Sequence, residues 1–228
     1  ARMELYDRPF RVLMVDGVGP IHPPSPEGYT WLLHAEDPCS RFCWVRPTKA
    51  NDAETVAKLL VEEVFLDVCG FPTILRTDRG TEYTAALVKE VCDYFKVRQA
   101  FGSAYHPQSQ GYIEARHKVI NQVLRCDVER YPQTWAKWAR VAQWCMRSTP
   151  GADRAGRSPY EIVTGLRPQG PISQLFEQNR GAKLTITGYV AALHDALENM
   201  HQHIRESLTI EYDRKIQEKE QAGVRSLE

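Results

Sequence analysis

Three acidic residues of this chain, Asp16, Asp78 and Glu114, occupy positions from which they could act together. Asp16 follows the apolar run 11–15, and Asp78 follows a second run at 73–77. Glu114 follows a polar, glycine-containing loop and opens a predicted helix. Carboxylates that a fold gathers at a sheet edge form a hard oxygen site suited to Mg²⁺ or Mn²⁺. The pattern therefore indicates a candidate metal site.

The elements that must position these acids begin with three predicted strands. The runs 12–15, 29–34 and 41–46 are predicted to be strands, the third with apolar and polar residues in alternation. A proline-rich loop connects the first two strands, and the remaining link is short. We therefore expect an antiparallel meander.

Helices and strands alternate after the meander. A helix capped at Asn51 or Asp52 precedes a strand at 73–76, and a second helix capped by Thr84 precedes a strand at 97–101. The predicted apolar face of the second helix comprises Leu87, Val88, Val91, Tyr94 and Phe95. This order of elements predicts an α/β or α+β fold with a mixed sheet.

The second half of the chain reads as mainly helical. Helices are predicted over 112–130 and 135–145, from Ser158 onward, and over 189–221. The apolar stripe of the last helix fits a packing face or a coiled-coil seam. Three tryptophans mark the helix at 135–145, and we expect at least two of them in the core, a dimer face being the alternative. They are Trp135, Trp138 and Trp144.

Composition narrows the function classes. The 228 residues carry a formal net charge of zero, so any nucleic-acid contact must come from a local basic patch. No run reaches the roughly 18 apolar residues of a membrane span, and the first residues lack the apolar core of a secretory signal. Six cysteines without CxxC spacing predict reduced thiols in an intracellular protein.

Several short motifs follow one another in a specific order. They are Val15-Asp16-Gly17, the segment 77–83, the segment 106–111 leading to Glu114, and the segments 147–150, 158–161 and 165–168. Together they resemble the catalytic core of retroviral-type integrases, most closely those of gypsy-type LTR retrotransposons, over about residues 9–170. The resemblance implies an RNase H-like fold, a five-stranded mixed sheet flanked by helices, with a C-terminal helical extension.

The same resemblance implies a domain organisation. Residues 1–170 would form the catalytic core, and residues 171–228 a helical linker toward a small C-terminal β-barrel domain. The paired His and Cys of the family's N-terminal zinc-binding domain are absent from this sequence. We therefore expect the chain to be a piece of a longer protein.

The activity implied is polynucleotidyl transfer, in which the 3′ ends of element DNA are trimmed and then joined to target DNA. Asp16, Asp78 and Glu114 would hold two Mg²⁺ or Mn²⁺ ions, with Asp16 as the bridging ligand. The chemistry agrees independently, since two divalent ions about 3.5–4 Å apart can stabilise both the attacking and the leaving oxygen of a phosphodiester.

The segment around Glu114 supplies the predicted DNA contacts. The glycine-bounded loop before it would lie beside the DNA end, and Lys118, four residues after Glu114, would share its helix face. At His117 the family commonly has Asn, so the fine geometry there is open. A plain surface loop and a solvated lysine are the alternatives. The predicted contacts are Tyr105, Gln108, Gln110, Arg116, His117 and Lys118.

Partners and location follow from the implied activity. The DNA partners would be element ends and target DNA, and the protein would act in the nucleus as a dimer or tetramer, because one active site cannot join two ends in concert. No membrane partner is expected, and the sequence does not identify a chromatin partner. A different class of function is a domesticated, catalytically silent module that acts by binding and oligomerisation. Another RNase H-like nuclease or a transposase is a third reading, disfavoured by the motifs at 147–168.

Overall fold

The structure is a computed structural model. It describes residues 8–67, 70–78, 80–101 and 132–170, together with the helical residues 194–195, 197–199, 201–202, 204–210, 213–214 and 217. The chain divides into two compact units, one of residues 9–147 and one of residues 1–8 and 148–228. Each unit is described by itself. The predicted domain boundary at residue 170 stays a prediction.

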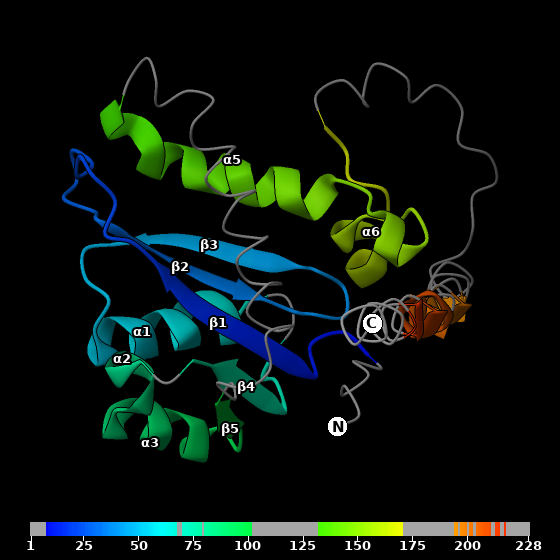
Figure 1. The fold of residues 1–228 in the computed structure, drawn as a ribbon, viewed down its shortest axis with the longest axis horizontal. Coiled ribbons are helices and arrows are strands. Elements are labelled where there is room, and N and C mark those ends of the chain that lie inside the picture. The colour runs from blue at the N-terminus through cyan, green and yellow to red at the C-terminus, as the bar shows by residue number, and fades with distance from the viewer. Residues whose placement is uncertain are drawn as a thin grey trace, which may run out of the picture. The chain divides into compact units, whose positions relative to one another are not determined.

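A five-stranded mixed sheet forms the centre of the unit 9–147, with strand order β3-β2-β1-β4-β5 (Figure 1). The meander β1–β2–β3 is antiparallel, while β4 and β5 run parallel to β1. The predicted mixed sheet and meander are thus confirmed. The strands are β1 Val12–Val18, β2 Trp31–Glu36, β3 Cys43–Thr48, β4 Ile74–Thr77 and β5 Arg98–Phe101.

The central strand β1 runs further than predicted. Val12 to Val15 are all buried, as expected for a strand covered on both faces. The strand does not end before Asp16, because pairing with β2 continues through Asp16 opposite His34 and on to Val18. Asp16 is therefore held inside the paired strand, two residues before its end. Asp78, by contrast, directly follows the last residue of β4, as predicted.

The helices between the strands lie on one side of the sheet in Figure 1. Asp52 caps the first of them by accepting a hydrogen bond from the Thr55 backbone N–H at 2.9 Å, which confirms one of the two predicted caps. The sequence did not indicate that its continuation would adopt π-helical geometry. The elements are α1 Ala53–Leu59, the π-helix η1 Leu60–Phe65, α2 Thr81–Thr84 and α3 Ala86–Tyr94.

Two details of α3 differ from the prediction. Thr84 ends the short helix α2, and Ala85, which makes no side-chain cap bond, precedes α3. Val88 is buried together with Cys92 one turn later, whereas Leu87 and Tyr94 are exposed. A helix this short covers the core along one narrow i, i+4 stripe, which explains why the broader predicted face was wrong at its margins.

Helix α5, Trp135–Ser148, lies on the other side of the sheet, after the 3₁₀ turn η2 at Pro132–Thr134 (Figure 1). Trp135 is buried and Trp138 packs partly buried against the same cluster, so the expectation of two core tryptophans is confirmed, while Trp144 is 39% exposed. The cluster beneath α5 comprises Leu32, Cys43, Val45, Trp135, Ala136, Ala139 and Met146.

The unit containing residues 148–228 is helical where it is described beyond residue 193, and it holds short helices before that. A 3₁₀ turn, η3 Ala152–Arg154, precedes α6 Pro159–Thr164, whose first turn is closed by a reciprocal capping box between Ser158 and Glu161. All described residues between 194 and 217 are helical. His201 Nε2 lies 2.7 Å from the carbonyl oxygen of Ile162, which ties this C-terminal segment to α6.

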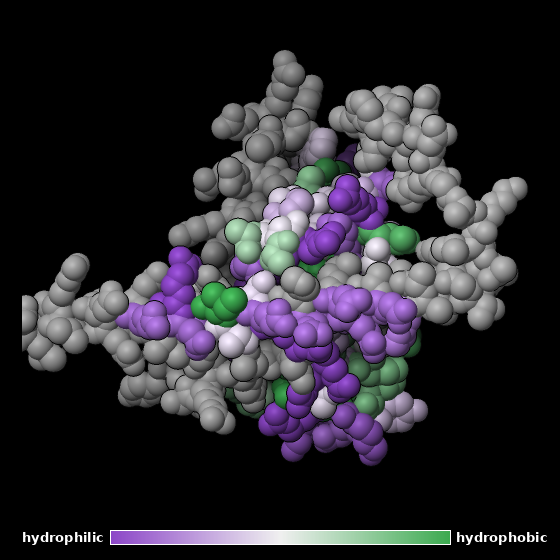
Figure 2. Space-filling view, turned by 90° about the vertical axis from the view of Figure 1, so that its right-hand side faces the viewer, coloured by the Kyte–Doolittle hydropathy of each residue, from purple (hydrophilic) through white to green (hydrophobic). Residues whose placement is uncertain are grey.

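One face of the molecule is mostly polar where its residues are described. Figure 2 shows hydrophilic residues over most of the coloured face, with separate hydrophobic groups between them. Among these residues no helix is both long enough and apolar enough to cross a bilayer. The four described cysteines, Cys39, Cys43, Cys92 and Cys145, are free thiols.

Candidate active site

Asp16 and Asp78 belong to two neighbouring segments of the sheet. β1 and β4 are parallel neighbours, and Val15 pairs with Thr77, the last residue of β4. Asp16 follows Val15 within β1, and Asp78 follows Thr77 directly after β4. Because adjacent strands are about 4.8 Å apart, the fold places both carboxylates close together where β4 ends beside β1. Two of the three predicted acids are thus brought together.

Local hydrogen bonds orient each carboxylate. The Gly17 backbone N–H donates to Asp16 Oδ1 at 2.8 Å, and the Gly80 backbone N–H donates to Asp78 Oδ1 at 2.9 Å. Each bond engages one oxygen of its carboxylate. Both side chains are therefore held by their own following backbone.

The electrostatics of the site disfavour two bare negative charges. Burial, with a further contribution from the Asp78 charge, raises the pKa of Asp16 to about 6, while the Gly17 N–H and His34 act in the opposite direction. His34 sits directly opposite Asp16 on β2. Carboxylates that repel each other in a partly buried place gain stability from a cation between them.

A third acidic side chain, that of Glu82, is fixed nearby. Glu82 Oε1 accepts a hydrogen bond from Asn51 Nδ2 at 2.8 Å, which connects α2 to the residue before the α1 cap. The Glu82 charge also acts on Asp16 by raising its pKa, although more weakly than that of Asp78. This pair comes from segments 31 residues apart.

Tyr83 is a buried neighbour of the same acids. Its side chain is fully buried, and its hydroxyl finds no hydrogen-bond partner among the residues that the structure describes. Burial raises its pKa, and the charges of Asp16, Glu82 and Asp78 raise it further. Three negative charges therefore act on this buried hydroxyl.

The donor set suits a hard divalent cation. Carboxylate oxygens are the ligands that Mg²⁺ and Mn²⁺ prefer. Within the described ranges no group of three His, Cys, Asp or Glu side chains meets the geometry of a metal site. Glu114, the third predicted ligand, lies outside those ranges. The predicted DNA contacts lie outside them as well, namely Tyr105, Gln108, Gln110, Arg116, His117 and Lys118.

Sequence reasoning missed three neighbours of the aspartates, namely His34, Asn51 and Tyr83. The positions of His34 and of the Asn51–Glu82 pair depend on strand register and tertiary packing, for which one sequence carries no direct signal. Tyr83 is the third residue of the four-residue helix α2, which is too short for an apolar period to reveal its burial.

Comparison with known proteins gives a consistent family. The family model described as integrase core domain matches residues 7–107. The chain is 27% identical over 162 residues to the retrovirus-related Pol polyprotein from transposon 412 of Drosophila melanogaster, covering 71% of this chain. It is 28% identical over 195 residues to the Gag-Pol polyprotein of feline leukemia virus, covering 85%. The chain spans 13% and 11% of the length of these two relatives.

Solved structures agree on the fold. The catalytic core domain of BIV integrase has a TM-score of 0.55 and 20% identity, with 68% of this chain and 93% of that chain covered. The catalytic core domain of HTLV-2 integrase, solved in complex with magnesium, has a TM-score of 0.54 and 18% identity, with coverages of 68% and 97%. These likenesses establish the RNase H-like integrase core fold. A special closeness to gypsy-type elements stays a prediction.

Proposed function

Because the chain carries an integrase core domain of the retroviral type, we propose that it processes the 3′ ends of retroelement DNA and transfers them into target DNA. The observation that carries the proposal is that Asp16 lies on β1 and Asp78 directly follows its parallel neighbour β4, one residue beyond the pair Val15–Thr77. Together with Glu114 they supply the three carboxylates that such chemistry requires.

Each aspartate has a distinct role in this proposal. Asp16, on the central strand and partly buried, would be the shared ligand of the ions. Asp78, exposed directly after the end of β4, would hold one of them. Two Mg²⁺ or Mn²⁺ ions, when bound, supply the charge that activates the attacking oxygen and stabilises the leaving one. The backbone N–H groups of Gly17 and Gly80 keep one oxygen of each carboxylate in place.

DNA is held by residues on either side of Glu114. Tyr105, Gln108 and Gln110 contact the DNA end, and Lys118 meets a phosphate from the Glu114 face of the helix. Arg116 and His117 extend this surface. Contacts to phosphates position the DNA without reading its sequence. Because the net charge of the chain is zero, contact with DNA requires a confined basic surface of this kind.

The chain acts as an oligomer in this proposal. Joining two DNA ends in concert requires two active sites, so a dimer or tetramer assembles on element DNA and target DNA in the nucleus. The similar HTLV-2 integrase core structure is described as a trimeric form. Association of integrase core domains therefore has a precedent among the neighbours.

Activity on oligonucleotides tests the proposal. A longer protein that includes both flanking domains is incubated with labelled DNA ends and Mn²⁺, and strand transfer and disintegration are measured. Glu114→Gln keeps the side-chain shape but removes an anionic ligand, so it is expected to abolish both reactions. Asp16→Asn and Asp78→Asn are expected to do the same.

The competing class of function gives a different result. A domesticated, silent module would bind DNA or a partner and oligomerise, with no metal-dependent activity in the longer protein. The three acids argue against this alternative, because binding and oligomerisation have no need of carboxylates that repel each other at the site of Asp16. Inactivity of the longer protein would overturn the proposed function.

A further inference from the structure

Two glycines close to the aspartates leave room for two specific side chains. A Cβ on Gly17 would lie 2.8 Å from Asn51 Nδ2 and 2.9 Å from Asn51 Oδ1. A Cβ on Gly80 would lie 2.8 Å from both carboxylate oxygens of Glu82. Real Cβ atoms do not approach other atoms this closely. The Asn51 amide and the Glu82 carboxylate therefore rest directly on the backbone that carries the two acids.

Asn51 and Glu82 also bind each other. The hydrogen bond from Asn51 Nδ2 to Glu82 Oε1 is 2.8 Å long and partly buried. It closes a path from the end of β1, through Asn51 and Glu82, to the turn after Asp78. Since Gly17 follows Asp16, and alternate side chains of a strand face opposite sides, this path runs on the face of the sheet away from the Asp16 side chain.

The Asn51–Glu82 contact connects the strand segment that carries Asp16 with the turn that carries Asp78. Asp16 is fixed by the paired strand β1, but Asp78 lies past the end of β4, in a turn held by the Gly80 N–H. Without a connection between this turn and β1, the turn could shift relative to β1. We propose that Asn51 and Glu82 form a positioning clamp that sets the separation of the Asp16 and Asp78 carboxylates for divalent cations. This inference rests on the proposed function.

The charge of Glu82 is a separate part of the clamp. Its carboxylate acts on Asp16 without being among the proposed ligands. Groups that hold metal ligands in place without binding the metal typically lower metal affinity by about 10–100-fold when they are removed. The clamp therefore affects cation affinity more than it affects the stability of the metal-free fold.

Cation binding by the 228-residue chain tests the clamp. Mg²⁺ and, in a second arm, Mn²⁺ are titrated by calorimetry into wild type, Asn51→Ala and Glu82→Gln. The amide introduced by Glu82→Gln still offers an oxygen to Asn51, so thermal unfolding without metal should change little. Both variants should bind Mg²⁺ about tenfold more weakly. The double variant Asn51→Ala/Glu82→Gln should bind Mg²⁺ more weakly than either single variant, because Asn51→Ala removes the contact whereas Glu82→Gln keeps an acceptor oxygen and removes the charge.

Two controls separate the possible failures. Glu54→Gln removes an exposed acid from the first turn of α1 and should leave Mg²⁺ affinity unchanged. Asp16→Asn should abolish binding if the proposed metal site exists. Loss of binding in Asp16→Asn with wild-type affinity in Asn51→Ala and Glu82→Gln would overturn the clamp alone. Absence of binding in wild type would overturn the metal site and the clamp with it.

Discussion

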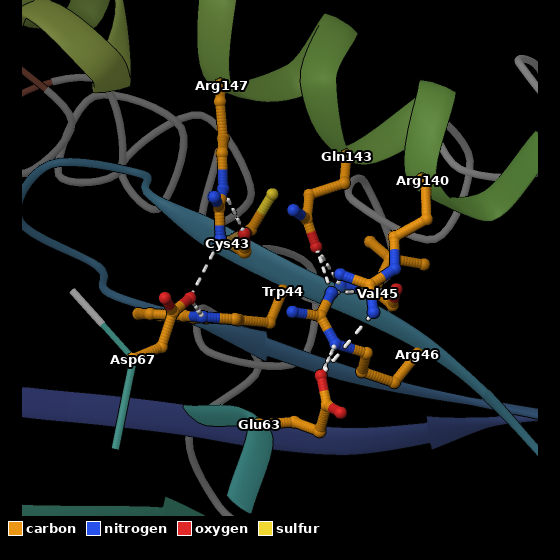
Figure 3. Close-up of polar contacts among 9 residues, drawn as sticks. All are labelled: Cys43, Trp44, Val45, Arg46, Glu63, Asp67, Arg140, Gln143 and Arg147. Carbon is orange, nitrogen blue, oxygen red and sulfur yellow. Dashed lines mark hydrogen bonds and ion pairs between the residues drawn. The ribbon is translucent and has the colours of Figure 1, made fainter. Parts of the chain in front are cut away.

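Gln143 Oε1 accepts a hydrogen bond from the backbone N–H of Val45 at 3.0 Å, joining α5 to the edge strand of the sheet (Figure 3). An edge strand points alternate N–H and C=O groups away from its neighbour, where they invite pairing with another chain. One turn further along α5, Arg147 Nε donates to the Cys43 carbonyl oxygen at 2.7 Å. Helix side chains thus satisfy the outer edge of β3.

The same helix is tied to the π-helix η1. Glu63 accepts hydrogen bonds from Arg46 Nε at 2.9 Å and from Arg140 Nη2 at 3.4 Å, and Arg46 also donates to Gln143 (Figure 3). Burial lowers the pKa of Arg46, and the Arg140 charge lowers it further, while Glu63 acts in the opposite direction. The acid of η1 therefore holds two cations that would otherwise repel.

Gln143→Leu tests the edge closure. The substitution keeps side-chain volume but leaves the Val45 N–H and the Arg46 guanidinium without this acceptor. Because the site is buried, the free energy of unfolding should fall by about 1–3 kcal/mol in urea titrations. Lys137→Leu, on the exposed side of α5, should change it by less than about 0.5 kcal/mol. Equal stability of the two variants would contradict the edge role of Gln143.

Arg147→Lys probes the shape of the guanidinium rather than its charge. Arg147 lies 3.9 Å above the Phe42 ring centre while its Nε reaches Cys43, and its Nη2 lies 3.9 Å from Asp67 Oδ2. A lysine ammonium cannot make the stacked and the edge contact together. We expect a loss of about 1–2 kcal/mol in the free energy of unfolding, measured by urea titration.

A matched change elsewhere on α5 controls for the arginine-to-lysine exchange. Arg140 is 59% exposed at its side chain and makes an ion pair with Glu63. Exposed pairs contribute about 0–1 kcal/mol, so Arg140→Lys should be nearly neutral. A loss in Arg140→Lys as large as that in Arg147→Lys would show that stacking and edge contact are not the cause.

The sequence predicted the position of Asp78 correctly, that of Asp16 only in part, and two tertiary contacts not at all. The run 73–77 ends before Asp78 in sequence and in structure, because the preceding Phe71-Pro72 and the following Asp78-Arg79-Gly80 bound this short segment with loop-forming residues. Asp16 was predicted to follow the strand, but β1 ends three residues later than predicted, at Val18, since pairing with β2, not local composition, decides where β1 stops. The Asn51–Glu82 and Val45–Gln143 contacts join segments 31 and 98 residues apart, so no local pattern reveals them.

Tyr83→Phe should stabilise the fold. The Tyr83 hydroxyl is buried and lacks a hydrogen-bond partner among the described residues, so it has lost its hydration without compensation. Removing the oxygen should raise the free energy of unfolding by about 1 kcal/mol in the metal-free protein. Tyr94→Phe, at a side chain that is 79% exposed, provides the control and should be neutral. A destabilised Tyr83→Phe variant would show that the hydroxyl has a partner in solution.

The last prediction concerns Asp37, in the turn between β2 and β3. Its Oδ1 accepts from the Cys39 N–H at 3.2 Å and its Oδ2 from the Ser40 N–H at 2.9 Å and from the Ser40 hydroxyl. Burial nevertheless raises the pKa of Asp37 from 3.8 to about 6, against the opposing effect of these hydrogen bonds.

The sign of the pH dependence follows from that shift. Between pH 3.8 and about 6 the folded protein keeps a proton on Asp37 that the unfolded chain releases. The contribution of Asp37 to stability is therefore present below this window and is lost as pH rises through it. Asp37→Asn removes the titration, although its amide satisfies the turn less well at every pH. Urea titrations from pH 4 to pH 7 should show the advantage of wild type over Asp37→Asn shrinking by on the order of 2 kcal/mol. An advantage that grows with pH would mean that the hydrogen bonds of the turn outweigh burial and that the pKa of Asp37 is lowered in the folded protein.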